Sequence, residues 1–286
     1  MFKKHQKTIA ILEINGVISA TSSKNVSLSD DFDLSAILDF LAKLRRKSQP
    51  LDGIFLRLNT PGGTAGASEE IARSLEKVKL ERHVPVVASI ADICCSGGYM
   101  IACVADTIYA NTQSLTGSIG TILQIPNYEE LAHKIGVRTI TIKSGKMKDI
   151  GNPMRQMEQE EVEYLTDLAE TGHLRFSNFV LKHRPDLQDI VNMMDGRPVD
   201  APTAKENNLI DEFGTYSDAY DALLKKIGLS DDGLRNLKEL RMKKKRSFLK
   251  RIFGSLTYPI LPAELLRLAS VLQGNPMRNK TENQFF

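Results

Sequence analysis

Several features that would indicate a function directly are scarce in this chain of 286 residues. It has only three cysteines, Cys94, Cys95 and Cys103, an odd number that forms no disulfide framework and fits a reducing compartment. The adjacent Cys94 and Cys95 also lack metal-ligand spacing with any nearby histidine. The sequence therefore predicts neither a disulfide scaffold nor a metal site.

Long apolar runs are missing as well. The N-terminal stretch reads MFKKHQKTIAILEINGVISA, and Glu13 and Asn15 interrupt it before it resembles a signal peptide. No other stretch approaches the roughly 18 uninterrupted apolar residues that a membrane span needs. We therefore expect a strand at the N-terminus and a chain that is cytoplasmic or peripheral to a membrane.

Outside a single segment, neither positive nor negative charge is in clear excess. The net charge is +3, and basic residues crowd near the C-terminus, at Arg241, Lys243, Lys244, Lys245, Arg246, Lys250 and Arg251. The rest of the chain is close to neutral, which argues against nucleic acid as the main partner. The hydrophobic content of 42% is ample for a buried core.

Alternating apolar patterns predict an α/β layered fold. Strands are expected at residues 8–18, 53–59, 84–90, 107–111 and 138–143, and amphipathic helices at 33–48 and 67–80 between them. A long helix is expected at 158–183, followed by shorter helices near 203–210 and 216–228. We divide the chain into a domain at 1–230 and a basic, partly apolar tail at 231–286.

Glycine-bearing turns follow three of the predicted strands, as NTPGGTAG, CCSGGYM and TGSIGT. In the second, Ser96 lies at a strand-to-helix turn, where the N-terminal amides of the next helix favour negative charge. This arrangement suits a nucleophile whose tetrahedral intermediate is an oxyanion. Pro61 fixes the entry of the first turn, so that Gly62 or Gly63 can supply a further amide donor.

A serine nucleophile needs a base, and the sequence alone leaves its identity open. The histidines, His5, His83, His133, His173 and His183, all lie outside the glycine turns, and the last two are expected at the surface of the long helix. The lysines Lys143, Lys146 and Lys148 follow the strand predicted at 138–143. A lysine must lose ~2 to 3 pKa units from about 10.4 to act as a base near neutrality. A cysteine nucleophile is disfavoured, because no cationic partner is adjacent in sequence.

The ordered stretches TPGG, SGGY, LTGSIGTI and TIKSGKMKDI, with DGRPVDAPTAKENNLIDEFG, resemble the signal peptide peptidase A (protease IV) family of bacterial Ser/Lys peptidases. The resemblance runs from about residue 7 to about 228. It implies the Clp protease/crotonase-like layered fold of repeated β-β-α units, here with a helical C-terminal extension. It also implies a serine endopeptidase that hydrolyses short or unfolded hydrophobic peptides, such as remnant signal peptides, without a cofactor.

The resemblance also implies the roles of individual residues. Ser96 in CSGGYM would be the nucleophile, and Lys148, the lysine directly before the Asp-Ile pair, would be the general base. Gly63 and Gly97 would donate the amides of the oxyanion hole. Ser118 in TGSIG would orient the amine of the base, although serine in a turn also forms local hydrogen bonds without any catalytic role.

For a family member with one copy of each motif, the resemblance implies a homo-octameric ring. In such a ring, the serine of one subunit meets the lysine of its neighbour. Because this chain has single copies, we expect such a ring, with active sites shared between subunits. Two departures from the family are expected to matter. The N-terminal membrane anchor of many members is missing, and Cys94 and Cys95 replace the usual small residues, so they line the site or make it oxidisable.

The C-terminal tail combines its basic residues with Phe248, Leu249, Ile252 and Phe253, a combination typical of a helix on an anionic membrane surface. Packing against a neighbouring subunit is the other interpretation. Two alternative functions also stay open: a crotonase-like acyl-CoA enzyme, and a catalytically silent, membrane-associated ring that serves as a scaffold.

Overall fold

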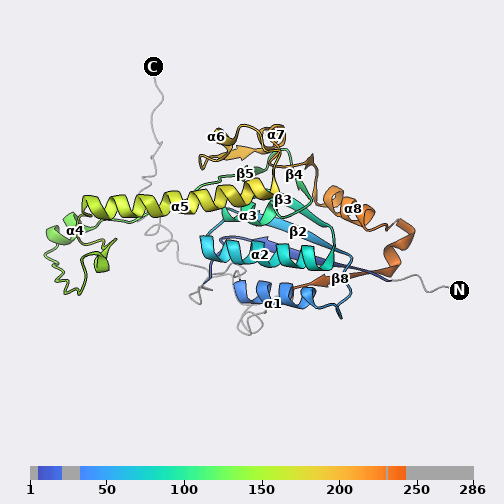
Figure 1. Cartoon of the computed structure of the whole chain (residues 1–286), viewed down its shortest axis with the longest axis horizontal. Helices are drawn as coiled ribbons and strands as arrows, with labels where there is room; N and C mark the ends of the chain where they lie inside the picture. The colour runs from blue at the N-terminus through green and yellow to red at the C-terminus, as the bar shows by residue number, and fades with distance from the viewer. Residues whose placement is uncertain (1–5, 21–32, 230, 243–286) are drawn as a thin grey trace, which may run out of the picture. The chain divides into compact units, whose positions relative to one another are not determined.

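The computed structural model describes residues 6–20, 33–229 and 231–242, which form a mixed α/β fold around one sheet (Figure 1). The strands are β1 (Lys7–Asn15), β2 (Gly53–Thr60), β3 (Val86–Cys95), β4 (Thr107–Ala110), β5 (Leu115–Gly117), β6 (Pro198–Asp200), β7 (Glu212–Phe213) and β8 (Leu237–Arg241). The helices are α1 (Leu34–Arg45), α2 (Ala65–Arg82), α3 (Gly97–Ala102), α4 (Glu129–Lys134), α5 (Gln159–His183), α6 (Ile190–Met193), α7 (Ala201–Glu206) and α8 (Tyr216–Lys226), with 3-10 turns η1 (Lys146–Asp149) and η2 (Asp231–Asn236).

The sheet is dominated by parallel pairs. Its order along the main path is β6-β5-β3-β2-β1-β8, and β4 pairs with both β3 and β7. Among the described strands only β5 and β6 pair in the antiparallel direction. Strand β3 pairs first with β4 and then, nearer its C-terminal end, with β5. These observations confirm the predicted α/β class.

Both faces of the central strands are covered, which explains their nearly continuous apolar sequences. Successive side chains of a strand point to opposite faces. In β1, Ile9 and Ile11 belong to the hydrophobic cluster that includes Leu223 of α8, whereas Ala10 and Leu12 belong to the larger cluster that includes residues of α1, α2 and α3. The sheet is therefore a middle layer, and the C-terminal ends of its strands carry the glycine turns.

One predicted strand is absent from the described chain. Residues 138–143 were expected to form a strand, but they have no regular secondary structure, and Ile140 and Ile142 are 89% and 96% exposed. Alternating β-branched residues favour an extended chain, but a strand also needs a hydrogen-bonding partner. None of the described strands supplies one, so this prediction is wrong for the single chain.

Helix α5 confirms the long helix predicted at 158–183. Near its C-terminal end, Phe176, Phe179 and Val180 are buried in the core. Its N-terminal end projects from the core together with residues 121–158, which we call the arm and which include α4 and η1 (Figure 1). No helix of the described residues, α5 included, is both long and apolar enough to cross a membrane.

The predicted division of the chain at residue 230 stays a prediction. Strand β8 lies beyond that position and pairs in parallel with β1, from Lys7 opposite Leu237 to Ile11 opposite Arg241. The expected basic and apolar helix of the tail, at residues 243–286, lies outside the described residues.

We expect the hydroxyl of Tyr99 to be a measurable source of stability. Tyr99 of α3 is fully buried and donates a hydrogen bond of 2.7 Å to the carbonyl oxygen of Leu209, which is also buried. Because Tyr99→Phe removes the donor from a buried acceptor, it should lower the free energy of unfolding by about 1–3 kcal/mol in denaturant titrations. Tyr164→Phe, on the half-exposed face of α5, is the matched control and should change it by less than about 0.5 kcal/mol. Equal effects would contradict this assignment.

Candidate active site

Ser96 occupies a sharp turn between the end of β3 and the start of α3. Its backbone has φ 52° and ψ −124°, a conformation that L-residues rarely adopt. Two hydrogen bonds hold it there: the Ser96 amide donates to the carbonyl oxygen of Gly117 at 2.8 Å, and the Met100 amide donates to the carbonyl oxygen of Ser96 at 3.1 Å. Strand β5 and helix α3 thus fix the residue from both sides, and its side chain remains partly exposed.

The Thr-Pro-Gly-Gly loop packs directly against this turn. Gly62 has φ +100°, and a Cβ added there would lie 2.8 Å from the Cβ of Ser96 and 2.7 Å from the carbonyl oxygen of Cys95. The loop is also bound to Ile18, whose amide donates to the carbonyl oxygen of Gly62 and whose carbonyl oxygen accepts from the Thr64 amide, both at 2.8 Å. Only glycine fits this close approach.

The amides of Gly63 and Gly97 lie close together beside Ser96. A Cβ added to Gly97 would be 3.6 Å from the nitrogen of Gly63. Within the described part of the chain, neither amide nitrogen donates a hydrogen bond to any protein group. Backbone amides without protein acceptors beside a partly exposed hydroxyl form the kind of site that stabilises an oxyanion.

Ser118 occupies the equivalent position on the neighbouring strand. Cys95 pairs with Gly117 in the parallel β3–β5 register, so Ser96 and Ser118 each follow a paired strand end. Ser118 has φ 50°, its amide donates to the carbonyl oxygen of Arg197 at 2.9 Å, and its Oγ donates to the carbonyl oxygen of Gly196 at 3.0 Å. The hydroxyl proton of Ser118 is thereby used in the bond to Gly196, but the lone pairs of its oxygen can still accept a hydrogen bond.

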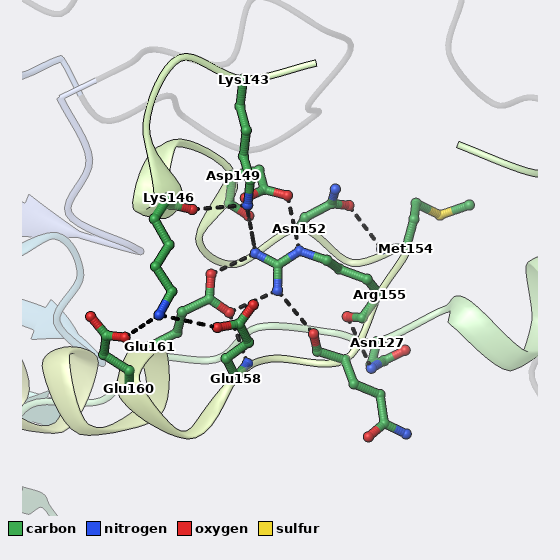
Figure 2. Close-up of polar contacts among 11 residues, drawn as sticks. Asn127, Lys143, Lys146, Asp149, Asn152, Met154, Arg155, Glu158, Glu160 and Glu161 are labelled. Carbon is green, nitrogen blue, oxygen red and sulfur yellow. Dashed lines mark hydrogen bonds and ion pairs between the residues drawn. The ribbon is translucent and has the colours of Figure 1, made fainter. Parts of the chain in front are cut away.

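The three lysines that the sequence could not separate have different surroundings, and Figure 2 shows those of Lys143 and Lys146. Lys143 donates to Asp149 Oδ1 at 2.5 Å and to the carbonyl oxygen of Lys146 at 2.9 Å. Lys146 forms ion pairs with Glu158 and Glu160, and the hydrogen bond with Glu160 raises its pKa.

Lys148 differs from both of these neighbours. It lies in η1 and is exposed, and its ammonium group contacts no hydrogen-bonding or charged partner among the described residues. It is therefore the lysine of the three that remains available to an external group.

Within the described residues of one chain, no hydrogen bond or ion pair joins Lys148 to the Ser96 site. The hydrogen bonds of η1 and of the loop leading to α5 stay within residues 127–161. Figure 1 shows the arm at the N-terminal end of α5, away from α3. The structure thus groups Ser96, Gly63, Gly97 and Ser118, and it leaves Lys148 on the arm.

The cysteines are poor nucleophiles in this fold. Cys94, Cys95 and Cys103 are all free and buried. Burial raises the pKa of the Cys95 thiol to about 11 and that of the Cys94 thiol well above its usual value. Because the reactive form is the thiolate, these thiols are unreactive near neutral pH.

The histidines do not serve Ser96 either. No hydrogen bond joins His83, His133, His173 or His183 to Ser96 in the described residues. His183, expected at the surface, is largely buried, and its ring lies 2.8 Å from the carbonyl oxygen of Phe179 and 3.2 Å from Glu76. His5 lies outside the described residues.

Sequence reasoning missed a charged cluster around Arg155. Its guanidinium contacts both Asp149 and Glu161, and the Glu161 carboxylate also accepts from the Glu158 amide at 2.9 Å (Figure 2). Glu158 and Glu161 form a capping box at the start of α5. The spacing of two acidic residues before a long helix was the available signal.

A protein-family model matches this chain at residues 78–230, and its description is peptidase family S49. A protein of Enterococcus faecium assigned as the signal peptide peptidase SppA is 34% identical over 226 residues, or 79% of this chain and 65% of that protein. A Synechocystis protein assigned as the protease slr0021 is 34% identical over 228 residues, or 79% of this chain and 77% of that protein. Protease 4 of Haemophilus influenzae is 28% identical over 221 residues, and the matched part covers 33% of its length.

Gly63 should tolerate no side chain, whereas the nearby Gly66 should. A Cβ at Gly63 would lie 1.9 Å from the carbonyl oxygen of Ile18, but one at Gly66 would meet nothing within 4 Å. Gly63→Ala should therefore lower the free energy of unfolding by about 1–3 kcal/mol or more. Gly66→Ala, within α2, should leave it unchanged or raise it by up to about 1 kcal/mol. Denaturant titration of the pair tests this, and similar values for both would refute the close packing.

The Glu161 carboxylate should stabilise the fold in a pH-dependent way. Hydrogen bonds from Arg155 and from the Glu158 amide lower its pKa from 4.5 to about 2. Because the folded-state pKa is depressed, its contribution is fully present above pH 4.5 and is lost as the pH falls toward 2. The melting temperature of the wild type should exceed that of Glu161→Gln at pH 6, and the difference should shrink at pH 3. Glu163→Gln, at an exposed site of the same helix, should show no such trend.

Proposed function

Because the chain belongs to peptidase family S49, we propose that it is a serine endopeptidase with a Ser/Lys dyad, in which Ser96 is the nucleophile and Lys148 the general base. The observation that carries this proposal is the grouping of Ser96 with the Gly63 and Gly97 amides, neither of which has an acceptor in the described chain. The chain spans 65% of the length of the E. faecium relative and 33% of that of protease 4, so the activity of those whole proteins enters only as part of this proposal.

The proposed reaction follows from these groups. The Oγ of Ser96 attacks the peptide carbonyl carbon while the neutral amine of Lys148 takes its proton. The oxyanion is held by the amides of Gly63 and Gly97, each such donor being worth ~3 kcal/mol of transition-state stabilisation. Lys148 then protonates the leaving amine, and water, activated by the same lysine, hydrolyses the acyl-enzyme.

The ion pairs of the arm support Lys148 as the base. Lys143 and Lys146 each form an ion pair with a carboxylate, and the hydrogen bond to Glu160 raises the pKa of Lys146, which disfavours the neutral form that a base needs. Lys148 lacks such a partner among the described residues, so entry into a dry site can favour its neutral form. Ser118, one strand away from Ser96, has lone pairs free to accept from that amine.

A base on a projecting arm implies that a second copy of the chain supplies it. The arm exposes many large apolar side chains, namely Ile122, Leu123, Tyr128, Leu131, Ile135, Val137, Ile140 and Ile142. Apolar surface of this extent marks an interaction site. We therefore include in the proposal a homo-octameric ring in which Lys148 of one subunit serves Ser96 of the next.

The proposed substrates are short or unfolded hydrophobic peptides, such as remnant signal peptides. The assignment of the E. faecium relative as a signal peptide peptidase supports this class. Contact of the basic tail with a membrane surface remains a prediction, since residues 243–286 lie outside the described part of the chain.

The dyad is tested by cleavage of an unstructured apolar peptide. Ser96→Ala and Lys148→Ala should each lower kcat/KM by roughly a thousand-fold or more. Removal of either member of a catalytic dyad costs about as much activity as removal of both. Lys146→Ala, which removes an exposed ion pair of the same turn, is the matched control and should stay within about two-fold of wild type. Retained cleavage in either dyad variant would reject the dyad, whereas no cleavage by the wild type would favour the acyl-CoA enzyme or the scaffold alternative.

Sharing of the site is tested by co-expressing Ser96→Ala and Lys148→Ala subunits with different tags. Random mixing should restore about a quarter of the wild-type activity, because some sites then combine an intact serine with an intact lysine from the neighbour. Size measurement should find the activity only in the assembled form. An active monomer would contradict the shared site.

A further inference from the structure

Arg155 joins the turn that carries Lys148 to the first turn of α5 (Figure 2). Its Nε donates to Asp149 Oδ2 at 2.9 Å, and its Nη2 donates to Asp149 Oδ1 at 3.0 Å. Its Nη1 and Nη2 also donate to Glu161 Oε2 and Oε1, at 2.7 Å and 2.5 Å. A single guanidinium is thus bidentate to two carboxylates from different elements.

The cluster is shielded although the arm around it is exposed. The side chain of Glu161 is 2% exposed and that of Asp149 is 11% exposed. Arg155 and Lys143 supply two positive charges, and Asp149 and Glu161 supply two negative ones, so the cluster is balanced. Shielded bidentate pairs hold a defined geometry, unlike isolated surface ion pairs.

The contacts fix both ends of η1 and leave its third residue free. At one end, the Lys143 ammonium binds the carbonyl oxygen of Lys146. At the other end, Arg155 binds the side chain of Asp149 and also its carbonyl oxygen, at 3.2 Å. Lys148, directly before Asp149, has no side-chain partner among the described residues, so its position is set by the backbone on which it stands.

We propose that Arg155 is a positioning residue for Lys148, holding η1 against α5 through Asp149 and Glu161 so that the amine reaches the neighbouring Ser96 in the right place. This inference rests on the proposed function, in which Lys148 is the base. Arginine is required because its planar fork binds both carboxylates at once, whereas a lysine ammonium is a point charge that cannot reproduce the double fork.

The first test compares Arg155→Met and Arg155→Lys with Lys146→Met as the matched control in the same turn. Loss of the bidentate guanidinium contacts should lower kcat by roughly 10- to 100-fold, since a displacement of the Lys148 amine by about 1 Å can cost that much. KM should stay within about two-fold, because within the described residues of one chain Arg155 contacts no group of the Ser96 site. Arg155→Lys should not rescue kcat, and Lys146→Met should resemble wild type. Wild-type kcat in either Arg155 variant would overturn the inference.

The second test locates the defect in one half of the shared site. Co-expression of Arg155→Met with Ser96→Ala should restore activity, because Ser96 of the first subunit receives an intact Lys148 from the second. Co-expression with Lys148→Ala should not. Equal restoration by both partners would overturn the inference. If Arg155→Met fails to assemble, Arg155→Lys, which keeps the charge, is used in the same crosses.

Failure of the inference and failure of the proposed function give different results. If Lys148→Ala is inactive and both Arg155 variants are fully active, the dyad stands and the positioning role is wrong. If Lys148→Ala is active, the dyad itself is wrong, whatever the Arg155 variants do. If the Ser96→Ala and Lys148→Ala mixture stays inactive because both groups act within one chain, the kcat of Arg155→Lys alone decides.

Discussion

The strained backbone of Ser96 depends on the hydrogen bond between its amide and the carbonyl oxygen of Gly117. A non-glycine residue at this φ costs of order 1–3 kcal/mol, and it persists only where its surroundings hold it. Here β5 holds the amide and α3 holds the carbonyl oxygen. Both elements are anchored in turn by a sheet buried on its two faces, so the hydroxyl and the adjacent amides are fixed before any substrate arrives.

The sequence predicted this region well because the relevant signals are local. Strands with apolar residues on both faces gave runs that could be recognised directly. Strands β1 and β2 begin and end close to the predicted bounds, whereas β3 extends to Cys95, beyond its predicted end at residue 90. The glycine turns were visible for the same reason. What spacing could not reveal is that Gly62 touches Ser96 and that Gly63 touches Ile18, since these contacts join separate segments.

The arm was predicted less well, because its structure depends on contacts that are not local in sequence. Spacing could not separate the three lysines, and only the ion pairs to Asp149, Glu158 and Glu160 distinguish two of them from Lys148. The link from Arg155 to Glu161 was also missed, although the pattern of the capping box was readable. A capping box predicts where a helix begins, but it does not predict which cation its carboxylate binds.

The error at residues 138–143 and the exposed position of Lys148 share one physical cause under the proposed function. Alternating Thr and Ile residues favour an extended chain, yet an extended chain with Ile140 and Ile142 in water has neither a hydrogen-bonding partner nor apolar cover. Binding of a second copy would supply both, and the same event would carry Lys148 to Ser96. The free energy of assembly would then also complete the dyad, so activity would follow subunit concentration by mass action. A single subunit, with its oxyanion-type amides already in position, would lack only the base.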